Sequence, residues 1–308
     1  MDHKLLLLTR DNEQYRHLIL NSALPGLTLL GDEPHNIKQA DIWLAEPGLA
    51  APLLGHATEL QWLQSTFAGV ESLMRPRLRQ DYLLTNIKGI FGPLMSEYLF
   101  GYLLAHQRQH AKYRQQQQDR VWQPGNFKTL QGRHLLLLGT GSIARHIAIT
   151  AKHFGMQVRG INRTGQAVDG FDRVMTLTAL PELLAQTDAI ANVLPSTPQT
   201  RHILDETLLS LMKPDAMLFN LGRGDVLDLT ALTTQLQRHP QQLAVLDVFN
   251  QEPLPTDHAI WQQSNAIITP HIAAPSFPEQ VMEIFCHNYK RFLEGQSLAH
   301  QVCFQQGY

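Results

Sequence analysis

Cysteine is scarce in this sequence: Cys286 and Cys303 are the only two among 308 residues. Two cysteines form no disulfide framework, and their positions match no metal-ligand spacing, so the sequence predicts two free thiols and no metal site. This scarcity excludes the small disulfide-stabilised folds and favours a reducing compartment.

Long apolar runs are also missing. No segment approaches the roughly 20 apolar residues that a membrane-spanning helix requires. The N-terminal run of leucines, residues 5–8, is too short for a signal-peptide core, and an acid, Asp2, stands where a signal would carry bases. From these absences we expect a cytoplasmic protein with no membrane partner.

An excess of charge of one sign is the third feature that the sequence lacks. Its 25 lysines and arginines nearly balance 27 aspartates and glutamates, and the formal net charge of -2 gives no reason to expect a nucleic-acid partner. What is there, 44% hydrophobic and 17% charged residues, is typical of a globular protein. A chain of 308 residues is longer than a domain with a single ordinary hydrophobic core and is long enough to form two α/β lobes.

Short apolar runs with turn-rich connections predict small βα units on a parallel sheet in a first lobe: KLLLLT, LTLLG, DIWLAEP and ELQWLQSTFAG. From Pro93 onwards, apolar residues recur at helical spacing for about five turns, which predicts a long helix that carries the chain into a second lobe. Six further apolar runs predict a doubly wound sheet in that lobe: HLLLL, QVRGIN, AIANVLP, AMLFNLG, LAVLDVF and AIITPH.

The last apolar pattern, PEQVMEIFCHNYKRFLEGQ, predicts an amphipathic helix that returns the chain to the first lobe. We therefore predict an α/β fold of two Rossmann-like or flavodoxin-like lobes with parallel sheets, and an active site in the cleft between the domains. Residues 1–95 with 279–308 form the predicted substrate-binding domain, and residues 96–278 form the predicted dinucleotide-binding Rossmann domain.

The first strand of the second lobe ends in a glycine-rich turn, GTGSIA, that opens a predicted helix. Gly139 permits the tight turn, and Gly141 lets a pyrophosphate approach the backbone. The helix that starts at Ser142 and Ile143 attracts phosphate through its N–H groups and its dipole. A tight turn that holds nothing is the alternative interpretation, but the position between strand and helix favours a dinucleotide site.

An NAD site normally has an acidic residue at the end of the next strand, where it binds the ribose hydroxyls. This sequence has Asn162, Arg163 and Thr164 there. An acid would repel the 2′-phosphate of NADP, whereas arginine offers a planar cation, so the sequence predicts NADP, with NADPH preferred and NAD as the alternative. The other interpretation is that Arg163 is an ordinary surface residue of a loop.

Polar residues follow three of the later predicted strands, where a doubly wound sheet binds its ligands. Arg223 follows the fourth apolar run of the second lobe, AMLFNLG, while Asp247 and Glu252 follow LAVL and His271 follows AIITP. A 2-oxo acid that accepts a hydride needs a cation for its carboxylate and carbonyl, a proton donor, and an acid that keeps the donor charged. Arg223, His271 and Glu252 fit these three roles, although each alone is equally consistent with a loop charge, a cap or a turn.

Taken together, these motifs resemble the D-isomer-specific 2-hydroxyacid dehydrogenases, and within that family the glyoxylate/hydroxypyruvate reductase A group. The resemblance extends over nearly the whole chain, through STFAGVESL, GTGSIA, NVLPSTPQTRHIL, NLGRGDVLD, LDVFNQEPLP, TPHIAA and QGY. It implies an NAD(P)-dependent oxidoreductase that reduces a small 2-oxo acid, glyoxylate or hydroxypyruvate, to the D-2-hydroxy acid. His271 would donate the proton with the assistance of Glu252, and Arg223 would anchor the substrate.

The resemblance also implies further contacts and a homodimer. The backbone of Ala68, Gly69 and Val70 would bind the substrate carboxylate. Family members are two-fold dimers that pack through the cofactor domain, so an arm containing Trp122 would reach across to a second copy. Additional cofactor contacts are implied at the later strand ends, at Leu194, Pro195, Leu221, Arg223 and Asp247, the last as hydrogen-bond partner of the carboxamide.

Two bulky residues, Trp43 and Met95, are the candidates for lining the substrate site away from the carboxylate. They lie beside loops that depart from the family pattern, AEPG and IFGPLMSEY. Their size favours a two- or three-carbon acid over one with an aromatic tail, and ordinary core packing is the alternative role for both.

Other functions stay open. Some relatives of these dehydrogenases sense dinucleotides as corepressors, and oxidation of D-3-phosphoglycerate is the nearest competing reaction, although the expected NADP preference and the lack of an added regulatory domain argue against it. Formate oxidation is disfavoured because those relatives carry glutamine where this chain has Glu252. A scaffolding protein would have no reason to place Arg223, Glu252 and His271 after three strands of one sheet.

Overall fold

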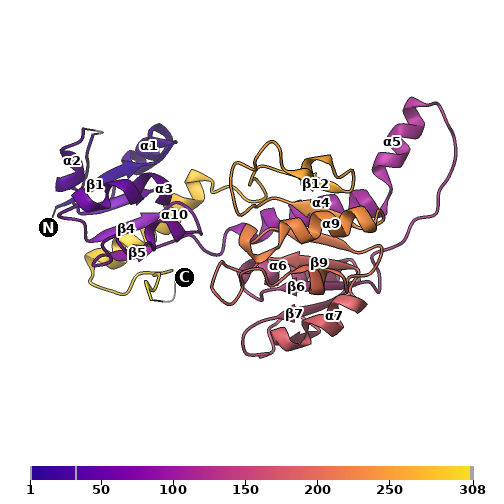
Figure 1. Ribbon diagram of the computed structural model, residues 1–308. Helices are drawn as coiled ribbons and strands as arrows, with labels where there is room; N and C mark the ends of the chain where they lie inside the picture. The colour runs from indigo at the N-terminus through magenta and orange to yellow at the C-terminus, as the bar shows by residue number, and fades with distance from the viewer. Residues whose placement is uncertain (1, 32, 306–308) are drawn as a thin grey trace. The chain divides into compact units, whose positions relative to one another are not determined.

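The computed structural model describes residues 2–31 and 33–305. The chain divides into two compact units, Met1–Ile90 with Ser276–Tyr308 and Phe91–Pro275, here called unit 1 and unit 2. Each unit contains one sheet whose paired strands are all parallel (Figure 1). The predicted α/β class with two parallel sheets is therefore confirmed.

Unit 1 has a five-stranded sheet in the order β2-β1-β3-β4-β5. The strands are β1 (His3–Leu8), β2 (Leu27–Leu29), β3 (Ile42–Ala45), β4 (Trp62–Ser65) and β5 (Leu83–Thr85). The helices are α1 (Asn12–Ser22), α2 (Asn36–Gln39), α3 (Pro47–Ala50) and α10 (Pro278–Leu293), with short 3-10 helices η1 (Ala51–His56) and η2 (Glu71–Leu73). Every residue of β3 and β4 is buried, as parallel strands covered by helices on both faces require.

The C-terminal helix α10 is part of the core of unit 1. The ring of Phe285 stacks on Trp62 of β4 with the centroids 5.2 Å apart, and the Tyr289 hydroxyl donates to Pro25 O at 2.8 Å. Asn288 Nδ2 donates to Gln64 Oε1 of β4 at 3.1 Å. Because these side chains of α10 and β4 are fully buried, the last helix completes the first lobe.

Unit 2 has a seven-stranded sheet in the order β12-β11-β10-β9-β6-β7-β8. The strands are β6 (His134–Leu138), β7 (Gln157–Ile161), β8 (Arg173–Met175), β9 (Ala189–Asn192), β10 (Met217–Asn220), β11 (Leu243–Leu246) and β12 (Ala266–Ile268). The helices are α4 (Phe91–Gln107), α5 (His110–Gln118), α6 (Ser142–His153), α7 (Leu180–Gln186), α8 (Glu206–Leu209) and α9 (Leu229–Arg238), with η3 (Leu177–Ala179), η4 (Gly224–Val226) and η5 (Ala259–Gln262). In the part of the chain that the structure describes, no helix is both long and apolar enough to cross a membrane.

Six strands of this sheet coincide with the six predicted apolar runs, and β8 is an additional edge strand. It has three residues and none of them is buried, so it lacks the apolar run by which the others were found. A very short edge strand is a common way to keep a sheet from pairing with other chains.

The boundary between the units lies a few residues from the predicted one, which placed residues 91–95 in the first domain. Unit 2 begins at Phe91 and includes all of α4. This helix packs closely on α6, because a Cβ at Gly92 would lie 2.7 Å from that of His146, and Ser96 Oγ lies 2.7 Å from His146 Nδ1. Contacts between two helices thus decide where the unit starts.

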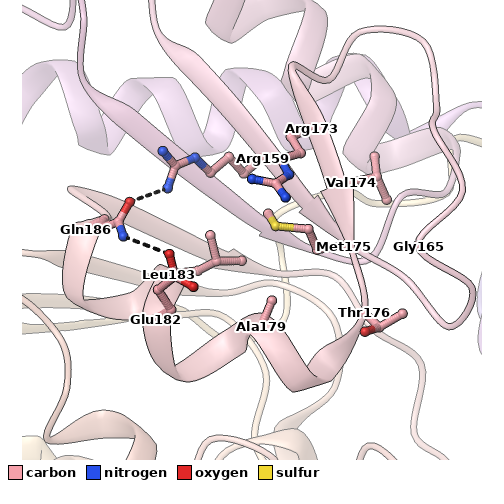
Figure 2. A pocket seen from close by; sticks show the side chains of 10 residues that line it. All are labelled: Arg159, Gly165, Arg173, Val174, Met175, Thr176, Ala179, Glu182, Leu183 and Gln186. Atoms are coloured by element: carbon pink, nitrogen blue, oxygen red, sulfur yellow. Dashed lines mark hydrogen bonds between the residues drawn. The ribbon is translucent and has the colours of Figure 1, made fainter.

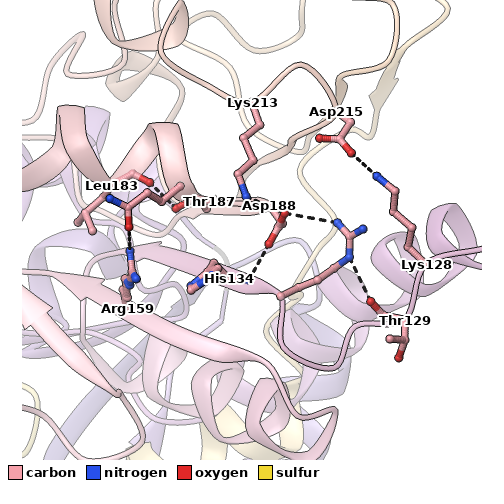
Figure 3. Close-up of polar contacts among 11 residues, drawn as sticks. Lys128, Thr129, His134, Arg159, Leu183, Thr187, Asp188, Lys213 and Asp215 are labelled. Atoms are coloured by element: carbon pink, nitrogen blue, oxygen red, sulfur yellow. Dashed lines mark hydrogen bonds and ion pairs between the residues drawn. The ribbon is translucent and has the colours of Figure 1, made fainter.

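Charged groups hold the amino-terminal edge of the unit 2 sheet together (Figure 3). Asp188 accepts hydrogen bonds from His134 N at 2.8 Å and from Lys213 Nζ at 3.0 Å, and Arg133 Nη1 lies 3.5 Å from its carboxylate. Burial, followed by the positive charge of Arg159, lowers the pKa of His134. These groups bind one another, so this edge has a structural role.

A segment of unit 2 that begins with α5 extends away from the sheet (Figure 1). No residue of α5 is buried, and Trp122 in the loop after it is 99% exposed. A tryptophan that leaves nearly its whole side chain in water packs against no core of its own unit.

Candidate active site

The predicted residues of unit 2 gather at the carboxyl-terminal edge of its sheet. β6 lies between β9 and β7, so the direction in which the sheet is wound reverses beside β6. Open parallel sheets bind ligands at such a reversal, outside the carboxyl ends of the strands. All the predicted unit 2 residues except Met95 lie in, or directly after, the turns that follow β6, β7, β9, β10, β11 and β12.

The turn between β6 and α6 has the geometry of a phosphate-binding loop. Gly139 has a φ of 106°, a conformation that favours glycine. Gly141 is the N-cap of α6, and a Cβ there would meet no atom within 4 Å, so the space beside it is open. A glycine cap has no side chain to accept from the first free N–H groups of the helix, which leaves the start of α6 suited to an anion.

Asn162, Arg163 and Thr164 form a turn at the end of β7. Asn162 Oδ1 accepts from Gly165 N at 2.7 Å and from Thr164 N at 3.1 Å, while its Nδ2 donates to Thr140 Oγ1 at 3.2 Å. This amide therefore joins the turn after β7 to the glycine turn after β6. Arg163 is exposed and makes no hydrogen bond or ion pair with the residues that the structure describes, which fits a guanidinium kept for an anionic ligand.

The turns after β9 and β10 are packed against each other. A Cβ at Gly222 would lie only 2.6 Å from Leu194 O, and Leu194 Cδ2 lies 3.6 Å from the position that a Cβ would take at Gly139. Leu194 is half-buried and Pro195 is exposed. Leu194 borders the glycine turn, as a residue that lines a cofactor site would.

Arg223 lies in the turn after β10, directly before Gly224. A Cβ at Gly224 would lie 1.9 Å from the backbone carbon of Phe249, so the backbones of the turns after β10 and β11 are in contact and only glycine fits. Arg223 is half-buried, and its Nη1 donates to Gly222 O at 2.8 Å. The close approach places the Arg223 turn against the loop that leads from β11 to Glu252.

His271 and Glu252 are in direct contact. His271 Nδ1 lies 2.8 Å from Glu252 Oε2, and Glu252 Oε1 accepts from Phe249 N at 2.8 Å. An ionised carboxylate only accepts hydrogen bonds, so Nδ1 carries the proton in this contact and Nε2 is the ring atom left for a ligand. The side chains are 57% and 37% exposed, so the pair is open to solvent. A carboxylate in this position orients the imidazole, as a general acid requires.

The backbone of His271 is in the left-handed region, with a φ of 55°. For a residue other than glycine this costs of order 1–3 kcal/mol and persists where surrounding contacts enforce it. Asp247 makes those contacts: its backbone O accepts from His271 N at 2.9 Å, and its carboxylate accepts from Ile272 N at 2.8 Å and Ala273 N at 2.9 Å. Asp247 is 1% exposed and shapes the turn that presents the imidazole, a role that the sequence pattern did not reveal.

In unit 1, the segment expected to bind a carboxylate follows β4. The backbone N–H groups of Ala68, Gly69 and Val70 donate to no acceptor among the residues that the structure describes. The segment is held by other atoms, because Asn86 Nδ2 donates to Ala68 O at 2.7 Å and the Val70 side chain lies in the core. Three successive amides without an acceptor fit an anionic ligand.

The structure corrects two expectations about side chains. Trp43 is fully buried in β3 and belongs to the core of unit 1, so its ring is in no position to line a substrate site. Leu221 is 3% exposed and belongs to the core of unit 2, which leaves only its backbone for a ligand. Met95 is half-buried and packs against the same core as Leu221.

A separate cavity of about 420 Å³ lies over β7, β8 and α7 (Figure 2). None of the predicted site residues lines it. Arg159 and Gln186 in its wall are joined by a hydrogen bond of 2.9 Å from Nη1 to Oε1. The cavity meets the turns described above only at Gly165, which directly follows Thr164 in the turn after β7.

Comparison with known proteins identifies the family. The model of the D-isomer specific 2-hydroxyacid dehydrogenase, NAD binding domain, matches residues 100–273, more than half of the chain. The chain belongs to the D-isomer specific 2-hydroxyacid dehydrogenase family. It is an NAD(P)-dependent dehydrogenase whose NAD-binding domain lies in unit 2, as the resemblance in the sequence implied.

Individual relatives of this dehydrogenase agree with that assignment. Glyoxylate/hydroxypyruvate reductase A from Yersinia enterocolitica is 33% identical over 214 residues, which are 70% of this chain and 68% of the relative. The crystal structure of a family member from Aeromonas salmonicida subsp. salmonicida is 49% identical with a TM-score of 0.94, and the match covers 99% of this chain and 100% of that one. An NADPH-dependent glyoxylate/hydroxypyruvate reductase from Sinorhizobium meliloti, in complex with NADP and sulfate, shares the fold with a TM-score of 0.87 at 24% identity over 100% of both chains.

Two residues near the candidate site of this dehydrogenase were not found from its sequence. Thr269 directly precedes Pro270 and His271 in the TPH motif, and its side chain is buried. Its position beside His271 is the signal by which the sequence could have indicated it. Tyr98 has no local signal, because it contacts Thr269 from 171 positions earlier in the chain.

Proposed function

We propose that this dehydrogenase reduces a small 2-oxo acid, glyoxylate or hydroxypyruvate, to the D-2-hydroxy acid with NADPH. The observation that carries the proposal is the 2.8 Å contact between His271 Nδ1 and Glu252 Oε2 at the carboxyl-terminal edge of the unit 2 sheet. The substrate class follows the relatives from Yersinia enterocolitica and Sinorhizobium meliloti, which are glyoxylate/hydroxypyruvate reductases.

The turns at this edge fit a nicotinamide dinucleotide. The open space beside Gly141 lets a pyrophosphate reach the first N–H groups of α6. Arg163 would bind the 2′-phosphate, Leu194 and Pro195 would border the cofactor, and Asp247 would accept a hydrogen bond from the carboxamide. When bound, the cofactor supplies the hydride. The NADP in the Sinorhizobium meliloti structure supports NADPH as the preferred form, with NAD as the alternative.

The proton and the substrate are handled by residues of the chain itself. His271 donates its proton from Nε2 to the carbonyl oxygen, while Glu252 accepts from Nδ1 and keeps the ring oriented. Arg223 binds the carboxylate and carbonyl oxygens through charge-assisted hydrogen bonds. The backbone amides of residues 68–70 are proposed to bind a carboxylate, and Met95 is the remaining candidate for limiting the size of the substrate.

Initial rates over a panel of 2-oxo acids test this proposal. Glyoxylate or hydroxypyruvate should have the highest kcat/KM, above pyruvate and phenylpyruvate. The kcat/KM with NADPH should exceed that with NADH. A preference for phenylpyruvate would contradict a small substrate site. Met95→Ala should raise the relative rate with phenylpyruvate if Met95 limits the site.

The same assay separates the alternatives. Oxidation of D-3-phosphoglycerate in the presence of oxidised cofactor, without reduction of glyoxylate, would indicate the competing dehydrogenase reaction. Binding of NADPH without turnover of any acid in the panel would indicate a dinucleotide sensor.

A further inference from the structure

The turn that carries His271 is connected to a helix far away in the sequence. Tyr98 of α4 places its hydroxyl 2.6 Å from Thr269 Oγ1, and Thr269 Oγ1 lies 2.6 Å from Asp247 Oδ1. Thr269 and Asp247 are both buried. Neither Tyr98 nor Thr269 contacts the substrate or the cofactor in the proposed reaction.

The direction of the hydrogen bonds that link Tyr98, Thr269 and Asp247 follows from the groups involved. Both oxygens of Asp247 face N–H groups that can only donate, those of Ile272 and Ala273, so the carboxylate acts as an acceptor. The single hydroxyl proton of Thr269 therefore goes to Asp247, and its oxygen is left to accept from Tyr98. Burial raises the pKa of Tyr98, which keeps the phenol protonated as the first donor.

Asp247 transmits this arrangement to His271. Its backbone O accepts from His271 N, and its carboxylate accepts from the next two residues of the turn. These bonds hold His271 in its left-handed conformation. A rotation of the Asp247 carboxylate would loosen them, and the imidazole would move with its backbone.

We propose that Tyr98 and Thr269 are positioning residues that hold the proton donor His271 in place through the carboxylate of Asp247. This inference rests on the proposed function of His271. Tyr98 is held rigidly because it lies in α4, a 17-residue helix that packs on α6. The first turn of α6 is the proposed phosphate site. One helix thus supports both the cofactor end and the proton-donating end of the site.

Isosteric variants test the hydrogen bonds that link Tyr98 and Thr269 to Asp247. Tyr98→Phe and Thr269→Val each remove one donor, and each should lower kcat for glyoxylate reduction about tenfold while the KM for NADPH changes less than twofold. Thr269→Ser keeps the hydroxyl and should restore most of kcat. Tyr82→Phe is the matched control, because it removes a buried hydroxyl of unit 1 that has no partner among the described residues, and kcat should be unchanged. Equal losses in the Val and Ser variants would overturn the proposal.

A double-mutant cycle with His271→Gln decides whether Tyr98 acts through His271. If it does, Tyr98→Phe should change kcat less than twofold in the His271→Gln background. A tenfold loss in that background as well would show that Tyr98 acts independently and would overturn the inference, while leaving the proposed function intact. If His271→Gln by itself leaves kcat unchanged, the proposed function fails, and the inference fails with it.

Discussion

His271 is held by two acidic residues in different ways. Glu252 contacts the ring at Nδ1. Asp247 accepts from three N–H groups of the turn, from that of His271 through its backbone O and from those of Ile272 and Ala273 through its carboxylate. The ring contact orients the imidazole, and the backbone contacts fix the turn that carries it. At the scale of single residues, the two contacts can therefore be separated by mutation.

Loss of the imidazole should remove the proton donor and spare the cofactor site. His271→Gln should lower kcat by roughly 10²- to 10⁴-fold, the usual contribution of general acid catalysis, with unchanged affinity for NADPH in a fluorescence titration. Glu252→Gln keeps the shape of the pair but removes the carboxylate that accepts from Nδ1, so kcat should fall while the affinity for NADPH stays unchanged. A kcat equal to that of the wild type would refute the pairing.

Arg163 should decide the choice between the two cofactors. We expect the wild type to prefer NADPH over NADH by at least tenfold in kcat/KM, about 1.4 kcal/mol. Arg163→Ala should weaken the binding of NADPH and leave the binding of NADH nearly unchanged, because only the 2′-phosphate interacts with the guanidinium. Arg114→Ala, a change of an exposed arginine in α5, is the control. An equal loss of affinity for both cofactors in Arg163→Ala would show that Arg163 has a structural role and does not select the cofactor.

At the scale of elements, two glycines of unit 2 should respond in opposite ways to alanine. Gly224 allows the turns after β10 and β11 to touch, and a Cβ there would overlap the backbone of Phe249. Gly101 lies inside α4, where a Cβ would meet no atom within 4 Å. Gly224→Ala should destabilise the protein by roughly 1–3 kcal/mol or more. Gly101→Ala should stabilise it by about 0.5–1 kcal/mol. Thermal unfolding followed by circular dichroism measures both, and a neutral Gly224→Ala would disprove the close contact.

The amino-terminal edge of the same sheet should make stability depend on pH. Burial and Arg159, outweighing Asp188, lower the pKa of His134 in the folded protein. The unfolded chain therefore binds a proton at this position more readily, and the free energy of unfolding should fall as the pH drops below about 6.5. His134→Gln should flatten this decline, measured as urea midpoints between neutral and mildly acidic pH.

Other histidines limit the size of that effect. Burial also lowers the pKa of His106 and His300, so the decline should become shallower in His134→Gln without vanishing. His17→Gln, at an exposed position of α1, is the control. A slope equal to that of the wild type would mean that His134 is solvated in the folded protein.

At the scale of the whole molecule, the exposed segment around Trp122 is the feature that one chain does not account for. We expect a homodimer in which this arm packs on a second copy, so sedimentation should give twice the 34.8 kDa of one chain. Trp122→Ser should raise the dissociation constant, because the indole is 99% exposed in the single chain. Trp261→Ser, at another exposed tryptophan of unit 2, should not. A species of 34.8 kDa at micromolar concentration would exclude the dimer.

Local patterns were sufficient for the sheets and for the glycine turn. Six apolar runs coincide with strands of unit 2, because buried parallel strands need continuous apolar residues. The turn at Gly139 and Gly141 was recognised because a strand, two glycines and a helix follow one another directly in the chain. The order of the turns that carry Arg223, Glu252 and His271 was equally visible, since a parallel sheet sends all its carboxyl ends to one edge.

Burial of individual side chains and contacts between distant segments depended on the tertiary structure. Trp43 looked like a site residue because the sequence of a strand that is buried on both faces does not say what covers each face. The start of unit 2 at Phe91 depends on the packing of α4 on α6. Sequence alone determined which residues of this dehydrogenase stand at the strand ends. Only the folded chain decided how they are held, because hydrogen bonds such as that of Tyr98 to Thr269 join residues 171 positions apart, and no local pattern records them.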